Sequence, residues 1–377
     1  MRIGVNTRFL LSSKMEGFGW YSYEVVKRLV EQHPEHEFVF FFDRPYDEKF
    51  IFGPNVKPVV LFPPTRSVLL IISWFEWALP RALKKEKVDI FFSPDGFLSL
   101  RSKCKQIGVI HDLNFNHHPE DMPWRFNKYY NYFFPKFAQK ATHLLTVSNY
   151  SKEDIVQSYG ISPSKITVAW NGAAAIFQPL SEEEQKKIRQ TYTKGAPYFL
   201  FVGALHPRKN IKTLFKAFQH YRKQGNEGQL LIVGTSLFKK NHTYDHLVDD
   251  AFKQDIHFTG HLAIEALAKV TASALALVFV PYFEGFGIPL VEAMRCGTPI
   301  IAGNLTSLPE VVGESGILVN PFDAKEIAAK MKLLAANSDL RKELSEKGLE
   351  RAALFNWDNT AEKVWDVIES CAKSHLE

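Results

Sequence analysis

Short runs of Val, Ile, Leu and Phe alternate along the whole chain with segments whose apolar residues recur at helical spacing. An apolar run bounded by glycine and polar residues predicts a strand that is buried on both faces of a sheet. In the first half of the chain the predicted strands are 2–6, 37–42, 59–62, 89–92, 106–110, 143–147 and 165–168. In the second half they are 198–202, 229–233, 256–258, 274–280, 299–301 and 316–319.

Helical patterns separate these strands. They include 19–31, 74–85, 124–139 and 152–159 in the first half, and 211–221, 264–272, 289–295 and 325–335 in the second. Strands that alternate with helices are typical of parallel sheets covered by helices on both faces. Because the alternation runs in two successive series, and 377 residues suit two domains, we expect an α/β chain of two Rossmann-like, doubly wound domains.

The break between the two series is expected at residues 177–190. Gln178-Pro-Leu interrupts the pattern, and Ser181-Glu-Glu-Glu184 has the spacing of a capping box that opens a new helix. Similar boxes stand at 307–310 and 323–326, where we interpret the acidic residues as helix caps rather than catalytic groups. The N-terminal domain is therefore expected at 1–180 and the C-terminal domain at 181–356.

Charge and cysteine content narrow the class of partner. The balance of 46 − 41 = +5 is mildly basic and diffuse, which suits an anionic small ligand or an anionic membrane surface but not nucleic acid. The scattered Cys104, Cys296 and Cys371 form neither a disulfide framework nor a metal motif, which favours a reducing cytosol. The first predicted strand begins at residue 2, so no signal peptide is expected. The longest apolar runs are far shorter than the ~20 residues that span a bilayer.

The most distinctive stretch places Glu284 and Glu292 eight positions apart, with Gly-Phe-Gly-Ile-Pro-Leu-Val between them. It joins a predicted strand to a predicted helix, so it is expected at the carboxyl end of a strand, where open α/β sheets bind ligands. Gly285 and Gly287 leave no side chain over the turn, and Pro289 is expected as the first helical residue. Amides at a helix start favour phosphate and separate carboxylates suit hydroxyl groups, so the turn fits a nucleotide-sugar.

Two cations follow the first strand of the second series. Arg208 and Lys209 lie in the run Phe201-Val-Gly-Ala-Leu-His-Pro-Arg-Lys-Asn210. Cations at a strand end could stabilise the negative charge that develops on a leaving diphosphate. The alternative is that both are solvated surface residues. Asn210 is expected to cap the helix 211–221.

A histidine ends the predicted strand 106–110. A lone histidine is usually structural, but His111 followed by Asp112 at a strand end is also a functional candidate. Asp112 could orient the loop or contact the substrate, and both interpretations stay open. We expect His117 and His118 in a loop, and no carboxylate completes a metal site there.

A glycine loop, 12–20, joins the first predicted strand to the first predicted helix. Its Gly17 and Gly19 give it the look of a phosphate-binding loop, but the third glycine of a dinucleotide fingerprint is missing.

The stretch 258–323 closely resembles the donor-binding core of the family 4 retaining glycosyltransferases. The likeness rests on the E-G-F-G-I turn, the E-A-M-R-C-G-T-P helix exit and the L-P-E-V turn together. Segments 146–154, 171–172 and 355–358 match the family in the same order, so the resemblance covers nearly the whole chain. It implies the GT-B fold, with two Rossmann-like domains that face a cleft and a last helix, 357–377, that crosses back onto the N-terminal domain.

The resemblance implies roles for the polar residues. Glu292 would bind the ribose hydroxyls of the nucleotide, and Glu284 would contact hydroxyls of the transferred sugar. Arg208 and Lys209 would stabilise the leaving diphosphate. Many members carry Arg where this chain has Ala204, so the phosphate clamp would rest on these two cations alone.

The other implied roles concern His111 and the glycine-rich turns. His111 would lie against the donor sugar and support the transition state. Gly17 and Gly19 would close over the donor phosphates and the acceptor. The backbone around the turn would approach the sugar and the phosphates, through Gly285, Phe286, Gly287 and Ile288.

The implied reaction moves a hexose, most often mannose or glucose in this family, from a GDP- or UDP-sugar to a glycan or a lipid-linked saccharide. The configuration at the sugar would be retained through a front-face reaction, without a bound metal or cofactor. A cytoplasmic enzyme of polysaccharide biosynthesis is expected, and peripheral contact with the inner face of the membrane stays open. Two alternatives remain: an epimerase or dehydrogenase acting on nucleotide sugars, which the incomplete glycine fingerprint disfavours, and a non-catalytic binder, which the full set of site residues disfavours.

The segment 68–77, Val-Leu-Leu-Ile-Ile-Ser-Trp-Phe-Glu-Trp, is unusually apolar. A core helix accounts for it. The alternative is a surface that meets the acceptor or a membrane, since many members of the family act on lipid-linked glycans.

Overall fold

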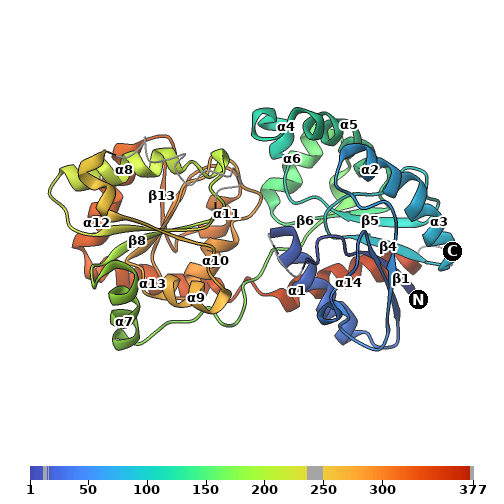
Figure 1. Cartoon of the computed structure of the whole chain (residues 1–377), viewed down its shortest axis with the longest axis horizontal. Coiled ribbons are helices and arrows are strands. Elements are labelled where there is room, and N and C mark those ends of the chain that lie inside the picture. Colours follow the sequence, from blue (N-terminus) through green and yellow to red (C-terminus); the bar gives the residue numbers. More distant parts are fainter. Residues whose placement is uncertain (12–14, 16, 236–248, 374–377) are drawn as a thin grey trace. The chain divides into compact units, whose positions relative to one another are not determined.

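The computed structural model describes residues 1–11, 15, 17–235 and 249–373. Within these ranges the chain forms two compact units. The first unit comprises Met1–Asn171 and Trp357–Glu377, and the second comprises Gly172–Asn356. Each unit is built on its own parallel β-sheet with helices on both faces (Figure 1). The α/β class and the two doubly wound sheets that the sequence predicts are therefore confirmed.

The sheet of the first unit has the strand order β3-β2-β1-β4-β5-β6-β7, with every neighbouring pair parallel. Each strand overlaps a predicted one, with small shifts at the ends. The strands are β1 Arg2–Asn6, β2 Glu37–Phe42, β3 Val56–Val60, β4 Ile90–Ser93, β5 Lys105–Val109, β6 His143–Thr146 and β7 Ile166–Val168.

Helices cover both faces of this sheet. They are α1 Gly17–Gln32, α2 Val68–Ser73, α3 Leu79–Lys85, α4 Asn114–His117, α5 Trp124–Lys140, α6 Asn149–Tyr159 and α14 Trp357–Lys373. α14 packs along α1 and against β4, β5 and β6, so the last helix belongs to the first unit (Figure 1). α2, α3 and α5 lie on the opposite face, over a core that includes Phe41, Phe91 and Phe137.

The apolar segment 68–77 divides between core and surface. It forms α2 and most of a single π-helical turn, Trp74–Ala78. Trp74 and Phe75 are fully buried, whereas Leu69 is 78% exposed and Trp77 is 43% exposed. The core-helix interpretation is therefore right for part of the segment, and the remainder presents apolar side chains to solvent.

The sheet of the second unit has the order β10-β9-β8-β11-β12-β13 and is also fully parallel. Its strands are β8 Tyr198–Val202, β9 Gln229–Val233, β10 Ile256–Gly260, β11 Ala276–Phe279, β12 Ile300–Gly303 and β13 Ile317–Val319. Its helices are α7 Glu182–Thr193, α8 Ile211–Lys223, α9 Ile264–Ala272, α10 Ile288–Arg295, α11 Leu308–Val312, α12 Ala324–Ala336 and α13 Ser338–Ala352. α8 and α12 cover one face, and α9, α10 and α13 cover the other (Figure 1).

Of the helix starts predicted from the sequence, one cap forms, two caps do not, and one helix begins a residue earlier. The capping box of Ser181 and Glu184 is confirmed at α7. The predicted cap by Asn210 is wrong, because this residue adopts a left-handed conformation and its side-chain oxygen accepts from the Thr213 hydroxyl, at 2.7 Å, rather than from a backbone amide of α8. Ser307 is also wrong as a cap, since its hydroxyl donates instead to the carbonyl of Glu284 at 2.8 Å. α10 starts at Ile288, so the following proline is its second residue.

The third predicted box is only half formed. Asp323 caps α12 by accepting from the amides of Lys325 and Glu326, as expected. Glu326 does not bond back to Asp323 and accepts from the amide of Asn320 instead, at 3.0 Å. The acids of this box therefore act on backbone groups, which agrees with a structural role.

Candidate active site

The centre of the second sheet is its topological switch point. β8 and β11 are neighbours, and the chain leaves β8 toward β9 and β10 on one side but leaves β11 toward β12 and β13 on the other. The loops after β8 and β11 therefore begin side by side at the carboxyl ends of the strands and lead to opposite halves of the sheet, which is the position where open α/β sheets bind ligands. Arg208 and Lys209 follow β8, and the turn from Glu284 to Gly287 follows β11.

Arg208 and Lys209 converge on Glu284. Arg208 Nη1 donates to Glu284 Oε2 at 3.0 Å, and Lys209 Nζ donates to the same oxygen at 2.5 Å. Lys209 also lies over the ring of Phe279, with its nitrogen 4.9 Å from the centroid. The structure thus brings together three residues that the sequence predicts for one site, and the two cations are not solvated surface residues.

The local electrostatics keep Glu284 ionised. Burial alone would raise the pKa of this carboxyl. The charges of Arg208 and Lys209, with their hydrogen bonds, outweigh that effect and bring the pKa below its usual value. With two cations beside one carboxylate, the cluster carries a net positive charge that suits an anionic ligand.

Hydrogen bonds to backbone carbonyls link the loop after β8 to the loop after β11. Tyr282 donates its amide to the carbonyl of Arg208 at 3.1 Å. The Asn210 side chain donates to the carbonyls of Val280, at 3.0 Å, and Pro321, at 2.6 Å. Sequence reasoning missed this cross-link because it assigned Asn210 to a helix cap. The left-handed backbone of Asn210, a conformation that asparagine tolerates, turns its amide toward β11 instead.

The turn after Glu284 presents free amides. Gly287 is the last residue before α10. Its φ of +98° is a left-handed backbone conformation that favours glycine. Within the described chain, the amides of Phe286, Gly287 and Ile288 donate no hydrogen bond. Unpaired amides at a helix start attract anions, so this turn offers uncharged donors beside the two cations.

Glu292 lies one turn into α10 and differs from Glu284 in its surroundings. Its carboxylate has neither a hydrogen-bond nor an ion-pair partner in the parts of the chain that the structure describes. Burial raises the pKa of Glu292 to about 7. The residue as a whole is only partly buried, and a carboxylate without protein partners retains its full capacity to accept hydrogen bonds from a ligand.

His111 lies at the corresponding edge of the first sheet, just after β5. Its Nε2 donates to the carbonyl of Pro94 at 2.7 Å, and its own carbonyl accepts from Ser151 Oγ at 3.0 Å. Its ring contacts Phe18 and Tyr21, each with centroids 4.8 Å apart. Burial lowers the pKa of His111, so the imidazole is neutral near pH 7.

The remaining candidates of the first unit are placed as follows. Gly17 is the exposed first residue of α1, and a Cβ on Gly19 would lie 2.9 Å from the carbonyl of Phe9, so Gly19 allows a close packing contact. Residues 12–14 and 16 of the predicted glycine loop lie outside the described residues. Asp112 accepts from the amide of Asn114 at 3.0 Å, which is a loop-orienting contact. His117 bonds Asp154 at 2.7 Å.

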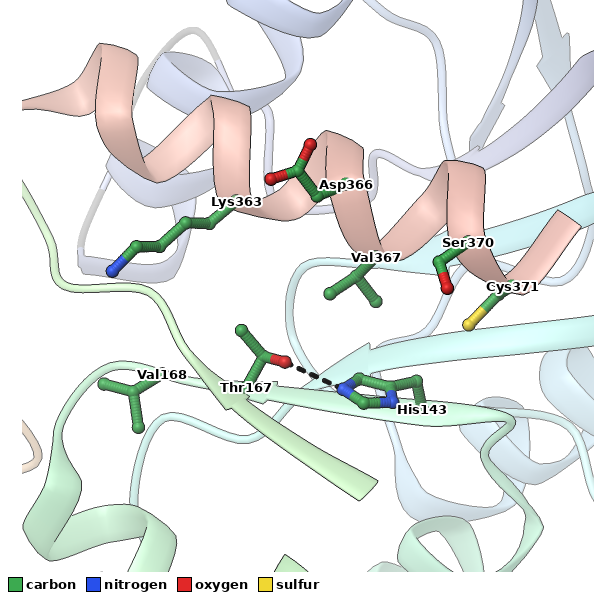
Figure 2. A pocket seen from close by; sticks show the side chains of 8 residues that line it. All are labelled: His143, Thr167, Val168, Lys363, Asp366, Val367, Ser370 and Cys371. Atoms are coloured by element: carbon green, nitrogen blue, oxygen red, sulfur yellow. Dashed lines mark hydrogen bonds between the residues drawn. The ribbon is translucent and has the colours of Figure 1, made fainter. Parts of the chain in front are cut away.

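A separate pocket of about 330 Å³ lies in the first unit between α14 and the strands β6 and β7 (Figure 2). It is lined by His143, Thr167, Val168, Lys363, Asp366, Val367, Ser370 and Cys371. Figure 2 shows that His143 points at the Thr167 hydroxyl, to which its Nε2 is bonded at 2.9 Å. None of the predicted site residues lines this pocket, so the candidate site stays at the carboxyl edges of the sheets.

Metal-binding clusters and membrane-spanning helices are absent from residues 1–11, 15, 17–235 and 249–373. In that part of the chain no three His, Cys, Asp or Glu side chains are arranged to hold a metal ion. No helix there is both long and apolar enough to cross a bilayer.

Two family models match the chain in the order of its two units. The model for Glycosyltransferase Family 4 matches residues 15–174, and the model for Glycosyl transferases group 1 matches residues 182–351. The O-antigen chain mannosyltransferase B of Escherichia coli is 28% identical over 357 residues, which are 92% of this chain and 93% of that protein. The chain spans only 31 to 59% of the length of further curated relatives.

Solved structures share the same architecture over nearly the full length. Sucrose-phosphate synthase from Thermosynechococcus elongatus gives a TM-score of 0.79 at 19% identity, over 98% of both chains. Alr3699/HepE of Anabaena, solved in complex with UDP-glucose, gives a TM-score of 0.76 at 16% identity, over 98% of this chain and 100% of that one. The chain therefore belongs to the family 4 glycosyltransferases, and it is a glycosyltransferase with the GT-B fold.

Proposed function

We propose that the second unit binds the diphosphate and the sugar of a nucleotide-activated hexose at the carboxyl ends of β8 and β11. The observation that carries this proposal is the convergence of Arg208 and Lys209 on Glu284 beside the free amides that start α10. A site with two cations and several uncharged donors matches a diphosphate. A carboxylate in the same cluster matches a sugar hydroxyl.

The cations exchange partners during the reaction. Before the donor binds, both pair with Glu284. A bound diphosphate competes for Arg208 and Lys209, which frees Glu284 oxygens for hydroxyl groups of the hexose. As the bond between the sugar and the phosphate breaks, negative charge grows on the leaving diphosphate. Fixed cations at that position stabilise the transition state more than the ground state.

Glu292 is proposed to bind the nucleoside. A ribose presents two adjacent hydroxyl groups, and one carboxylate accepts a hydrogen bond from each. Glu292 has the free acceptors for this role and its raised pKa reflects their desolvation. Donating hydroxyl groups favour the ionised form, so nucleotide binding lowers the pKa of Glu292 again.

We further propose that His111 of the first unit acts on the same donor sugar as a hydrogen-bonding group, and that the first unit binds the acceptor. Transfer proceeds with retention by a front-face reaction, in which the departing phosphate takes the acceptor's proton. Retention is tested with donor hydrolysis, because the first sugar released keeps the donor's anomeric configuration in its proton NMR spectrum. Initial release of the opposite anomer would show inversion.

The donor is proposed to be GDP- or UDP-linked, with mannose as the favoured hexose. Mannose is supported by the E. coli relative named as a mannosyltransferase, and UDP by the Anabaena structure solved with UDP-glucose. A thermal-shift screen against nucleoside diphosphates and their sugars decides between the bases. A ligand at 100 times its Kd stabilises the folded state by about 2.7 kcal/mol. If none of these ligands shifts the unfolding temperature, the donor proposal fails.

We propose that the acceptor is a glycan or a lipid-linked saccharide and that α5 holds the enzyme at an anionic membrane surface. One face of α5 carries aromatic and basic residues at every fourth position, Trp124, Lys128, Tyr132, Lys136 and Lys140. Trp124 and Tyr132 are 63% and 58% exposed, and the helix has four basic residues and no acidic one. Exposed Trp and Tyr with Lys suit the interfacial region of an anionic leaflet.

Vesicle sedimentation tests this surface. Neutralising Lys128 and Lys136 with glutamine removes two charges worth about 1 kcal/mol each, so binding to anionic vesicles should weaken ~30-fold. Lys332→Gln with Lys342→Gln, two exposed lysines of the second unit, is the matched control. The proposed membrane contact would be contradicted if both double variants bound anionic vesicles equally well. It would also be contradicted if the wild type bound neutral vesicles as well as anionic ones.

A further inference from the structure

A buried network at the carboxyl edge of the first sheet centres on Asp95, which follows β4. Its carboxylate accepts hydrogen bonds from Arg8 Nε at 2.7 Å, Asn6 Nδ2 at 2.8 Å, Ser93 Oγ at 2.9 Å and the amide of Phe97 at 3.2 Å. Arg8 and Asn6 lie at the end of β1, the neighbour of β4 in the sheet. No sequence motif pointed to this network, although a charged residue directly after a strand end was a visible signal.

The network is buried, and the Arg8 guanidinium is enclosed by aromatic rings. The side chains of Arg8 and Asp95 are 5% and 2% exposed. The Arg8 guanidinium lies 3.9 Å from the ring centroid of Phe97, and it also lies over Phe9 and Phe75. Removing one partner of such a pair would leave an uncompensated buried charge, so the loop after β4 has one favoured arrangement.

This loop passes very close to β5. Gly96 has φ +79°, and a Cβ on it would lie 2.8 Å from the carbonyl of Val109. Only glycine allows the approach without strain. The approach brings the carbonyl of Pro94, the residue before Asp95, within 2.7 Å of His111 Nε2.

The contact with Pro94 fixes the tautomer of His111. A carbonyl oxygen can only accept a hydrogen bond, so Nε2 carries the proton and Nδ1 of the neutral ring is an acceptor. Nδ1 has no partner among the described residues, and the side chain is partly exposed. Ser151 holds the backbone of the same residue from the start of α6. The backbone and one ring nitrogen are therefore anchored, and the other nitrogen keeps its acceptor lone pair.

We infer that the Arg8–Asp95 pair positions His111, through the carbonyl of Pro94, so that unprotonated Nδ1 accepts a hydrogen bond from a sugar hydroxyl. The inference rests on the proposed function, because it gives His111 a substrate. Arg8 and Asp95 are positioning residues that do not touch the sugar themselves. A carboxylate behind a histidine usually bonds the ring directly, whereas here the influence passes through a backbone carbonyl.

Nitrogen NMR of histidine-labelled full-length protein tests the tautomer. Wild-type protein should give a protonated Nε2 and an unprotonated Nδ1 for His111, identified by the signals that His111→Gln removes. In Asp95→Asn the carboxylate no longer pairs with Arg8, so the two nitrogen shifts should move toward each other as the tautomers interconvert. Ser93→Ala removes one donor to Asp95 and should give a smaller shift in the same direction. If Asp95→Asn does not fold, Ser93→Ala alone tests whether the network sets the tautomer of His111.

Kinetics separate positioning from general destabilisation. Asp95→Asn should lower kcat for donor hydrolysis by roughly 10- to 100-fold with little change in KM for the donor, the usual size of a loss behind a ligating or catalytic histidine. The matched control is Asp43→Asn, another fully buried carboxylate at a strand end of the same sheet, paired with Arg44 and Thr65. The control should leave the His111 signals and kcat unchanged.

The inference is overturned if His111 carries its proton on Nδ1 in the wild type. It is also overturned if Asp95→Asn and Ser93→Ala leave the His111 signals in place. A separate outcome concerns the proposed function alone: if His111→Gln keeps full donor hydrolysis, the role of His111 in the reaction is wrong, while the NMR result still decides whether Asp95 positions the ring.

Discussion

The two sheets end in edges of the same architecture but different electrostatics. At the edge of the second sheet, two cations share one carboxylate, and a second acid, Glu292, has no partner in the described chain. At the edge of the first sheet, Arg8 and Asp95 neutralise each other and present a neutral histidine. An edge with two cations and a carboxylate that has free acceptors suits a nucleoside diphosphate. A neutral histidine beside the Arg8–Asp95 pair suits uncharged hydroxyl groups, which agrees with the proposed division of the substrate between the units.

The largest expected effect is at the charged edge. Lys209→Met removes a nearly buried cation at the proposed diphosphate site, and should lower kcat by ~10²- to 10³-fold, as the loss of one preorganised charge-stabilising group does elsewhere. The measurement is initial-rate donor turnover. Lys212→Met, an exposed lysine on α8, is the control. A loss of less than about threefold in Lys209→Met would break the comparison, because the edge would then not stabilise charge.

The neutral edge should show a smaller effect. His111→Gln keeps an uncharged side chain that can hydrogen-bond but loses the anchored Nδ1 acceptor, so kcat should fall by ~10²-fold or less. The affinity for the nucleoside diphosphate itself should stay within about twofold of wild type, because the phosphates bind at the other edge. Titration calorimetry checks this. Equal losses in nucleotide affinity for His111→Gln and Lys209→Met would contradict the proposal that the phosphates bind at the edge of the second sheet alone.

A pH profile sharpens the account of the charged edge. Glu292 must be ionised to accept two hydroxyl hydrogen bonds, and its pKa is about 7. Binding is therefore favoured above pH 7 and weakened below it. At pH 6 about a tenth of the carboxylate is ionised, so the Kd for a nucleoside diphosphate should be about tenfold higher than at pH 8.

The control for the pH profile is the same titration with Glu292→Gln. The phosphate groups of the ligand titrate equally in both experiments, so the difference between the profiles isolates Glu292. A wild-type profile that runs parallel to the Glu292→Gln profile would show that this carboxylate does not bind the ribose.

The smallest effect concerns one glycine at each edge. Gly287 and Gly96 both have positive φ, so alanine at either position should lower the free energy of unfolding by about 1–2 kcal/mol. Chemical denaturation measures the loss. Gly287→Ala should also weaken nucleotide binding, whereas Gly96→Ala should shift the NMR signals of His111. The control is Gly225→Ala, which has positive φ in open space. If both edge variants behave like this control, the loops do not set the site geometry.

The sequence predicts the fold well because periodicity reports local burial. Every strand of both sheets overlaps a predicted apolar run, and the capping box at Ser181 forms as expected. Predictions fail where a side chain serves a distant partner. Asn210 bonds Val280 and Pro321, and Ser307 bonds Glu284. Both residues have good cap chemistry, and only the tertiary structure shows the competing partner.

The candidate site likewise contains residues that local motifs predict and residues that they do not. Glu284, Glu292 and the two cations could be named from motifs, because their residue types suit a diphosphate and a diol. The network of Arg8 and Asp95 could not, because its members are 87 positions apart and carry no family signature. Their partnership depends on β1 and β4 being neighbours in the sheet. Strand order is a long-range property that periodicity does not contain.

The most direct test of the central claim compares one variant from each edge in a single assay. Titration calorimetry of GDP and UDP is performed on wild type, Lys209→Met and Asp95→Asn. The account predicts that at least one nucleotide binds the wild type, that Lys209→Met weakens its binding by tenfold or more, roughly 1.4 kcal/mol, and that Asp95→Asn leaves the Kd within about twofold. Unchanged binding in Lys209→Met, or an equal loss in Asp95→Asn, would contradict it.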